Sequence, residues 1–143
     1  MQRLVDSHTH LDHFPTQEID SIVTRAIENR VGLIISAGTT LESSEHCVNL
    51  SKTIPMVFAG VGIHPMDLTE KIGNKTYKAL ETLASENPKV VCISEIGLDF
   101  LPTSPAYDIQ IQSFKRQINL ARDLDKPIIV HSREAHPEVL KTL

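Results

Sequence analysis

Short apolar runs alternate along the chain with segments in which apolar residues recur at helical spacing. The apolar runs occupy residues 4–10, 33–38, 56–65, 90–97 and 127–131. Most of these runs are nearly continuous, which is typical of strands that are buried on both faces of a parallel sheet. One run and one helical segment recur roughly every 25 to 35 residues, and such alternation predicts parallel strands joined by helical crossovers.

The segments between the runs predict four helices, and a further helical stretch begins near Ala135. In the first segment, apolar residues fall at i, i+3, i+4, i+7 and i+8 counted from Ile19, which is the pattern of an amphipathic helix. Thr16 is expected to cap this helix and Gly32 to end it. The other helices are expected around residues 43–50, 77–84 and 108–125.

The first run carries two histidines on one side of the predicted strand. Because alternate side chains of a strand share a face, His8 and His10 point the same way, with Asp6 beside them. Two imidazoles in this arrangement suit the beginning of a divalent-metal site. A polar strand end with incidental histidines would show the same pattern, so the other strands must decide between the two interpretations.

Glu95 is a carboxylate within the otherwise apolar fourth run. Burying an unpaired carboxylate among valine and isoleucine is costly, so Glu95 requires a cation, a proton or several hydrogen-bond donors. The alternative to a metal ion is a structural ion pair with a lysine or arginine of a neighbouring strand. Asp99 shares the strand face of Glu95 only if Gly97 does not bend the strand.

The third and fifth runs end in histidines as well. His131 follows three apolar residues and is either a metal ligand or a hydrogen-bonded core histidine. His64 follows two glycines that let other groups approach the backbone, so it is either a substrate-facing group or a histidine at the rim of a loop. Arg133 shares the strand face of His131 and would bind a substrate phosphate through two hydrogen bonds, unless it is a solvated surface arginine.

All of these polar residues fall at the carboxyl ends of predicted strands, the edge at which parallel α/β folds build their sites. Together they predict one metal site. Mixed imidazole and carboxylate ligands suit Zn²⁺, Mn²⁺ or Fe²⁺, and a site with more oxygen ligands suits Mg²⁺. The expected chemistry is metal-assisted hydrolysis, in which the ion polarises a phosphoryl or carbonyl oxygen and generates hydroxide from bound water.

Composition narrows the setting of such a site. The chain has 143 residues with 41% hydrophobic content, and one domain spanning residues 1–143 is expected. A net charge of −4 and the lack of a basic run exclude the broad basic surface of a protein that coats nucleic acid nonspecifically. Metal ions bound to acidic ligands would still bind the phosphates of a nucleic-acid substrate. Cys47 and Cys92 are expected to be buried and reduced. The sequence shows neither a signal segment nor an apolar run of membrane-spanning length, so we expect a cytoplasmic protein.

Four sequence blocks resemble the TatD-type metal-dependent deoxyribonucleases, which belong to the amidohydrolase-like TIM barrels. The blocks are residues 6–12 (Asp-Ser-His-Thr-His-Leu-Asp), 62–65 (Gly-Ile-His-Pro), 94–100 (Ser-Glu-Ile-Gly-Leu-Asp-Phe) and 127–135 (Pro-Ile-Ile-Val-His-Ser-Arg-Glu-Ala). They occur in the family's order and spacing, and the resemblance covers nearly the whole chain. It implies an α/β fold, a TIM (β/α)₈ barrel of the amidohydrolase type that is truncated here to about five strands and four to five helices.

The resemblance also implies roles for individual residues. His8 and His10 would bind one metal ion. Glu95 would bridge two ions as the catalytic carboxylate, and His131 would bind the second ion. His64 would either contact the substrate or support the metal ligands from behind. Arg133 would contact the substrate, as its strand position also indicates. The implied cofactors are two divalent ions, with Mg²⁺, Zn²⁺ or Mn²⁺ as candidates, and the implied reaction is hydrolysis of DNA phosphodiesters from the 3′ end.

A complete barrel of this type has eight strands and about 250 residues. The family's metal-binding histidine of the sixth strand and aspartate of the eighth therefore have no counterpart here. We expect a truncated polypeptide, self-association through unpaired sheet edges, or a protein without activity. The alternative functions are hydrolysis of a small amide, lactone or phosphoester, and a non-catalytic interaction module. Glu95 favours the nuclease branch, because related small-molecule hydrolases often use a modified lysine as the bridging ligand.

Overall fold

The computed structural model of the protein describes residues 3–143 and contains one sheet of five parallel strands. The strands are β1 (Leu4–Thr9), β2 (Val31–Ala37), β3 (Val57–Val61), β4 (Val90–Asp99) and β5 (Ile128–Arg133). They lie side by side in chain order, as expected when each strand is followed by a helix that crosses back over the sheet. The prediction of a parallel α/β sheet is therefore confirmed.

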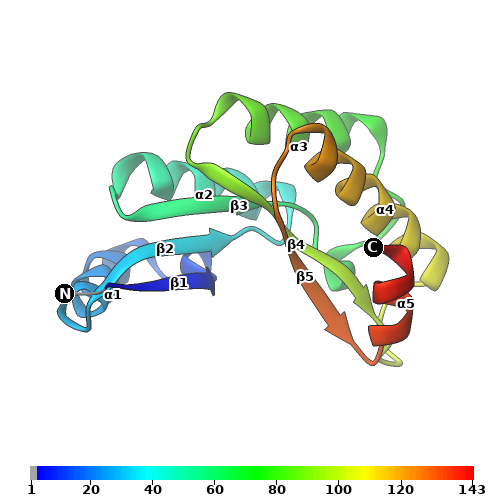
Figure 1. Cartoon of the computed structure of the whole chain (residues 1–143), viewed down its shortest axis with the longest axis horizontal. Coiled ribbons are helices and arrows are strands. Elements are labelled where there is room, and N and C mark those ends of the chain that lie inside the picture. Colours follow the sequence, from blue (N-terminus) through cyan, green and yellow to red (C-terminus); the bar gives the residue numbers. More distant parts are fainter. Residues whose placement is uncertain (1–2) are drawn as a thin grey trace.

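Helices alternate with the strands along the whole chain. They are α1 (Thr16–Glu28), α2 (Leu41–Thr53), α3 (Asn74–Glu86), α4 (Tyr107–Asp123) and α5 (His136–Thr142), together with the short 3₁₀ helices η1 (Leu11–His13) and η2 (Pro65–Asp67). Figure 1 shows the sheet bent into an arch, with α2, α3 and α4 on its outer side and β1 and β5 at its two ends. Within residues 3–143, no strand pairs with the outer edge of β1 or β5. This arrangement is that of an open sector of a barrel.

The main hydrophobic core lies between the outer face of the sheet and helices α2, α3 and α4. Leu80 and Phe114 are among its largest fully buried members, and a smaller cluster around Leu11 packs against α1. Nearly every residue of β4 is buried, whereas Leu4 and Val5 of β1 are 62% and 59% exposed. β4 is therefore the best-packed strand, and the side chains at its end are held in a rigid frame.

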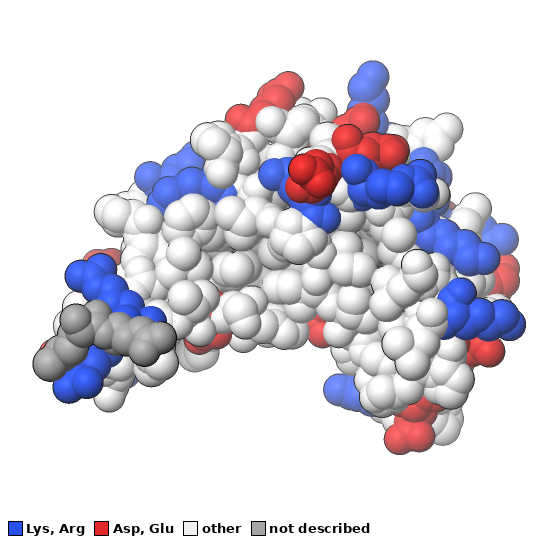
Figure 2. All heavy atoms as spheres, in the orientation of Figure 1, with Lys and Arg blue, Asp and Glu red and all other residues white. Residues whose placement is uncertain are grey.

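Many charged side chains lie over the outer helices. Figure 2 shows lysine, arginine and acidic side chains there, and a few charged groups along the lower edge of the arch. A hollow of about 460 Å³ opens on the inner face of the sheet, where residues of β1, β2, β4 and β5 line it. Among residues 3–143, every helix is too short or too polar to cross a lipid bilayer.

The two cysteines lie inside the packed layers, as the sequence predicts. Cys47 and Cys92 are free thiols, and both are buried. Burial raises the pKa of both thiols, that of Cys47 to about 12. Neither cysteine is therefore a reactive thiolate at neutral pH.

The ends of the first helix differ from the sequence prediction. Thr16 is the first residue of α1 rather than its cap, because Pro15 occupies the capping position. Gly32 lies within β2, and α1 already ends at Glu28. Arg30 takes the left-handed conformation, with φ of 66°. Such a conformation was expected at Gly32, the predicted end of the helix.

The third strand is also shorter than predicted, so that His64 lies beyond it. β3 ends at Val61, and the next two backbone N–H groups donate to side chains of helices instead of to a neighbouring strand. Gln117 Oε1, for example, accepts the Ile63 N–H at 2.7 Å. His64 caps η2, and its Nδ1 atom accepts the backbone N–H of Met66 at 3.1 Å.

Lys89 anchors β4 at its amino-terminal end. Its ammonium group lies within 3.1 Å of four backbone carbonyl oxygens, those of Ser51, Ile54, Pro55 and Val57. It also lies 5.1 Å from the centroid of the Phe58 ring, at cation–π distance. Because these carbonyls belong to the end of α2, the following turn and the start of β3, one side chain joins three consecutive segments to β4.

We predict that Lys89→Met, which keeps most of the stem and removes the ammonium group, lowers the free energy of unfolding by about 1 to 3 kcal/mol. The carbonyl oxygens would lose their charged donor. Urea denaturation followed by circular dichroism measures the change. Lys78→Met, at an exposed position on α3, is the matched control and should change the value by less than about 0.5 kcal/mol. Equal losses for the two variants would contradict the anchoring role.

Candidate metal centre

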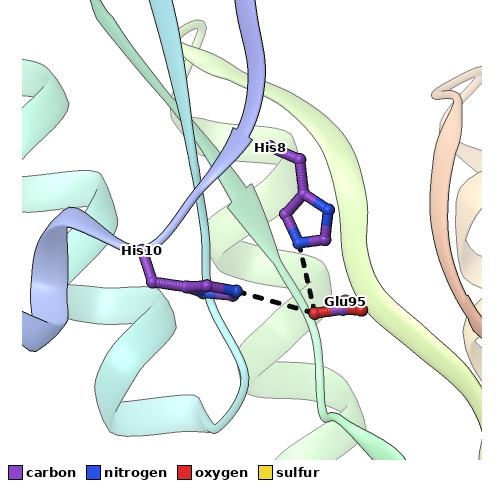
Figure 3. A group of neighbouring side chains, drawn as sticks. All are labelled: His8, His10 and Glu95. Atoms are coloured by element: carbon purple, nitrogen blue, oxygen red, sulfur yellow. Dashed lines mark hydrogen bonds and ion pairs between the residues drawn. The ribbon is translucent and has the colours of Figure 1, made fainter.

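A single carboxylate on β4 is in contact with histidines from the two edges of the sheet, on or next to β1 and on β5. Glu95 is 8% exposed, and its Oε2 atom lies 3.2 Å from Nε2 of His8 and 3.7 Å from Nε2 of His10 (Figure 3). Its Oε1 atom lies 3.3 Å from Nδ1 of His131 on β5. The structure therefore brings together the four residues that the sequence singled out as metal ligands.

Local structure aims the first two imidazoles at Glu95. His8 lies on β1 and His10 directly follows that strand, and both side chains reach the same carboxylate, as their alternation predicts. The Nδ1 atom of His10 donates a hydrogen bond to the Ala37 carbonyl at 2.8 Å, which leaves Nε2 facing Glu95. The rings of His8 and His10 meet edge to face, with centroids 5.2 Å apart. Both rings thus present a nitrogen atom to one carboxylate oxygen.

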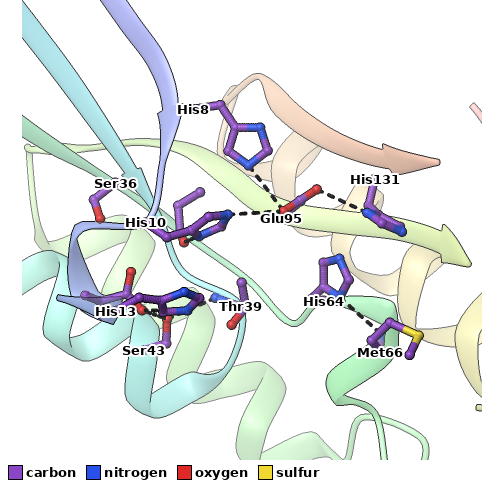
Figure 4. Close-up of polar contacts among 12 residues, drawn as sticks. His8, His10, His13, Ser36, Thr39, Ser43, His64, Met66, Glu95 and His131 are labelled. Carbon is purple, nitrogen blue, oxygen red and sulfur yellow. Dashed lines mark hydrogen bonds and ion pairs between the residues drawn. The ribbon is translucent and has the colours of Figure 1, made fainter. Parts of the chain in front are cut away.

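Two groups of potential metal donors share Glu95. His8, His10 and Glu95 form the first group, and their ligand atoms lie within 4.8 Å of one another. His64, Glu95 and His131 form the second group within the same distance. Figure 4 shows the second pair of histidines on the side of Glu95 away from His10, and the two rings of that pair are 4.3 Å apart. His64, which the sequence placed at the substrate, thus also lies beside His131.

A third group of potential donors, formed by His10, Asp12 and His13, shares His10 with the first group. Its ligand atoms also lie within 4.8 Å of one another. However, one nitrogen of His10 is bonded to a backbone carbonyl and the other faces Glu95. Asp12 accepts the hydroxyl of Ser43 at 2.6 Å, and this bond joins η1 to the start of α2. The third group therefore lacks an uncommitted imidazole at His10.

The neighbouring histidines decide the protonation state of Glu95. Burial works to raise the pKa of Glu95, but the hydrogen bond with His131 and the positive charges of nearby histidines outweigh it and lower the pKa to about 2. The same hydrogen bond raises the pKa of His131 against the effect of burial. Burial and the charge of His131 lower the pKa of His64. Glu95 is therefore ionised at neutral pH and offers two oxygen atoms to a cation.

β4 and β5 run further than predicted, which places Asp99 and Arg133 at the site. The two strands stay in register through Gly97, where a Cβ atom would collide with the His131 carbonyl. Asp99 is 0% exposed, and its Oδ2 atom lies 2.8 Å from Nε2 of His131. The same oxygen lies 3.7 Å from Nη1 of Arg133, whose side chain is 54% exposed at the rim.

Two buried glutamines of α4 hold the backbone around the site, and sequence reasoning missed this role. Gln117 accepts the Ile63 N–H at 2.7 Å and donates to the Ile63 carbonyl at 3.0 Å. Gln110 accepts the Asp99 N–H and donates to the Asp99 carbonyl, both at 2.8 Å. Each glutamine is 1% exposed, and the two are seven residues apart on one helix face. Polar residues at i and i+7 on the apolar face of a helix were the available signal.

Comparison with known proteins places these residues in a family. The family model described as TatD related DNase matches residues 5–143. The chain belongs to the TatD-related DNase family. One relative, from Escherichia fergusonii, is named 3′-5′ ssDNA/RNA exonuclease TatD and is 33% identical over 124 residues, which cover 87% of this chain and 47% of that protein. A relative from Buchnera aphidicola, named an uncharacterized metal-dependent hydrolase, is 30% identical over 98% of this chain and 56% of its own length.

Solved structures confirm the fold of this TatD-family chain. The TatD homologue YjjV of Escherichia coli K12 matches it with a TM-score of 0.86 at 31% identity, over 97% of this chain and 54% of YjjV. A TatD-family hydrolase of Entamoeba histolytica shares the fold with a TM-score of 0.81 at 21% identity, over 98% of this chain and 53% of that one. The chain spans about half the length of the relatives it matches. The prediction of a TIM barrel represented by five strands is confirmed.

We predict that the Glu95 carboxylate makes this TatD-family chain less stable in acid. Its pKa is about 2 in the folded chain and 4.5 ordinarily, so its contribution to stability is complete above about pH 4.5 and is lost as the pH falls towards about 2. Glu95→Gln should therefore lower the free energy of unfolding well above pH 4.5, and the difference from wild type should shrink in acid. Urea denaturation of chelator-treated protein at a series of pH values measures this. Glu45→Gln, at an exposed position on α2, is the control. A Glu95→Gln difference that persists unchanged at pH 2 would contradict the prediction.

Proposed function

We propose that this chain carries part of a two-metal hydrolytic site at the carboxyl ends of its strands. The observation that supports this most is the shared position of Glu95. Its two oxygens face separate histidine groups, at 3.2 and 3.7 Å on one side and 3.3 Å on the other. A carboxylate that presents one oxygen to each of two donor groups is arranged to bridge two ions. Cations would also compensate for the burial of its negative charge.

The donor set fits divalent ions that accept both nitrogen and oxygen ligands. His8 and His10 would hold one ion, His131 would hold the other, and Glu95 would join them. Imidazole and carboxylate donors suit Zn²⁺ and Mn²⁺, and Mg²⁺ would need further oxygen ligands. When bound, such ions polarise a phosphoryl oxygen and lower the pKa of bound water, so that a hydroxide nucleophile is present at neutral pH.

His64 and Arg133 are suited to position a substrate phosphate. Arg133 presents a half-exposed guanidinium group at the rim of the site, and such a group binds phosphate oxygens through two parallel N–H bonds. The Nδ1 atom of His64 accepts a backbone N–H, so the ring proton lies on Nε2. His64 would therefore donate a hydrogen bond to a phosphate oxygen rather than bind an ion.

We infer that the substrate is a DNA phosphodiester that is hydrolysed from the 3′ end. The Escherichia fergusonii relative carries the name of a 3′-5′ exonuclease of single-stranded DNA and RNA. Arg133 and the proposed ions both suit a phosphate group. Since the chain spans about half the length of its relatives, we propose that further βα units complete the site with a histidine and an aspartate. They would pair with the open edges of β1 and β5, within one polypeptide or from a second chain.

Hydrolysis of a small amide, lactone or phosphoester is the second candidate function. The observation that bears on it is the hollow of about 460 Å³ on the inner face of the sheet, whose volume lies in the range of small-molecule sites. His8 belongs to the lining of the hollow as well as to the first donor group, so a small ligand there would approach the proposed ions.

We predict that the protein, completed by the further βα units and supplied with Mn²⁺, releases nucleotides from 3′-labelled single-stranded DNA. Glu95→Gln and His131→Ala each remove a donor to the ions and should slow the reaction by about 100-fold or more. His136→Ala, at an exposed position where α5 begins, is the matched control and should keep the wild-type rate. Full activity of both site variants would contradict the proposed function.

A panel of small esters, lactones and amides, assayed under the same conditions, separates the candidate functions. Faster turnover of a panel compound than of DNA would overturn the DNA assignment in favour of the small-molecule hydrolase. If the completed protein binds Mn²⁺ and hydrolyses none of the substrates, its metal site has a non-catalytic role.

A further inference from the structure

Asp99 is a buried carboxylate to which the proposed hydrolytic site gives no role. It is 0% exposed at the end of β4, and its Oδ2 atom lies 2.8 Å from Nε2 of His131. The other ring nitrogen of His131, Nδ1, lies 3.3 Å from Oε1 of Glu95. The imidazole of His131 is therefore placed between two carboxylates, with the shorter contact to Asp99.

The carboxylate of Asp99 is held in one orientation by its other contacts. Its Oδ1 atom accepts the hydroxyl of Ser104 at 2.6 Å and the backbone N–H of Leu101 at 3.0 Å. Gln110 fixes the backbone of Asp99 through both its N–H and its carbonyl group. Since two donors occupy Oδ1, the Oδ2 atom is left to face His131. An ordered acceptor at one ring nitrogen determines which tautomer a histidine adopts.

We propose that Asp99 is a positioning residue that keeps the ring proton of His131 on Nε2 and leaves the lone pair of Nδ1 for a metal ion. A neutral imidazole carries one N–H, and the buried oxygen at 2.8 Å is the better placed acceptor for it. The lone pair then points to the side of the ring on which Glu95 lies. The inference rests on the proposed function, because that function makes His131 a ligand of the second ion.

The same oxygen of Asp99 also reaches the residue proposed to bind the substrate phosphate. Nη1 of Arg133 lies 3.7 Å from Oδ2 of Asp99, and the two residues are partners in the register of β4 and β5. His131 and Arg133 occupy alternate positions on β5, so their side chains project to the same side. Asp99 thus orients a metal ligand and a phosphate-binding side chain together.

Asp99→Asn distinguishes this positioning role from simple packing. The N–H of Leu101 requires an acceptor at the Oδ1 position, so the asparagine keeps its oxygen there and turns its NH₂ group towards His131. That NH₂ group would donate to Nε2, and the ring proton would move to Nδ1, on the side of Glu95. A side chain of nearly the same shape would thereby remove the lone pair from the metal side.

The test is the tautomer of His131 in metal-free protein, read by long-range ¹H–¹⁵N NMR at alkaline pH, where the ring is neutral. We expect the Nε2–H form in wild-type protein and the Nδ1–H form in Asp99→Asn. Asp108→Asn, on a side chain of α4 that is 65% exposed, is the matched control and should keep the Nε2–H form. Calorimetric titration with Zn²⁺ gives a second readout, in which Asp99→Asn should lose about 10- to 100-fold in affinity.

An Nδ1–H form in wild-type protein, or an unchanged tautomer in Asp99→Asn, would overturn the proposal. The wild-type spectrum decides the question even if the asparagine variant does not fold. The tautomer is measured without metal or substrate, so its outcome is independent of the hydrolysis assay. Failure of the proposed function would appear as wild-type protein that hydrolyses no DNA, with the His131 tautomer as expected.

Discussion

Burial of an ionised carboxylate in an apolar strand is the constraint on which this site depends. Glu95 lies in the best-packed strand of the sheet, where an isolated negative charge would be strongly unfavourable. Imidazoles from β1, from the residue that follows β1 and from β5 lie against this carboxylate, and its hydrogen bond with His131 helps to keep it ionised. The resulting arrangement presents two groups of potential donors to cations.

The strand that carries this carboxylate is fixed at both ends. Lys89 binds a ring of backbone carbonyls just before β4 begins, and Gln110 holds the backbone where β4 ends. Between these anchors, parallel packing brings the carboxyl ends of the neighbouring strands to the same edge. The site therefore lies at an edge of the sheet whose backbone is held by the buried amides of Gln110 and Gln117, both from α4.

The periodicity of apolar residues was sufficient to predict the parallel sheet, and the misplaced polar residues at strand ends predicted the cluster around Glu95. Those signals are local, since each needs only a strand pattern and one residue that violates it. The contacts of Asp99 and the two hydrogen bonds of Gln117 with the Ile63 backbone could not be predicted in the same way. They depend on how elements distant in sequence are aligned with one another. The prediction that His64 ends the third strand was wrong for a related reason. The strand ends earlier, where the Gln117 side chain bonds to the backbone of Ile63. The end of the first helix could not be predicted from glycine positions either, because Arg30 rather than a glycine takes the left-handed conformation there.

We propose above that Glu95 joins two metal ions, and electron paramagnetic resonance of the Mn²⁺-loaded protein tests this most directly. Two Mn²⁺ ions bridged by one carboxylate are magnetically coupled, and their spectrum differs from that of isolated ions. We predict a coupled spectrum in wild-type protein and its loss in Glu95→Gln. A wild-type spectrum of isolated ions alone, or a coupled spectrum that survives in Glu95→Gln, would contradict it.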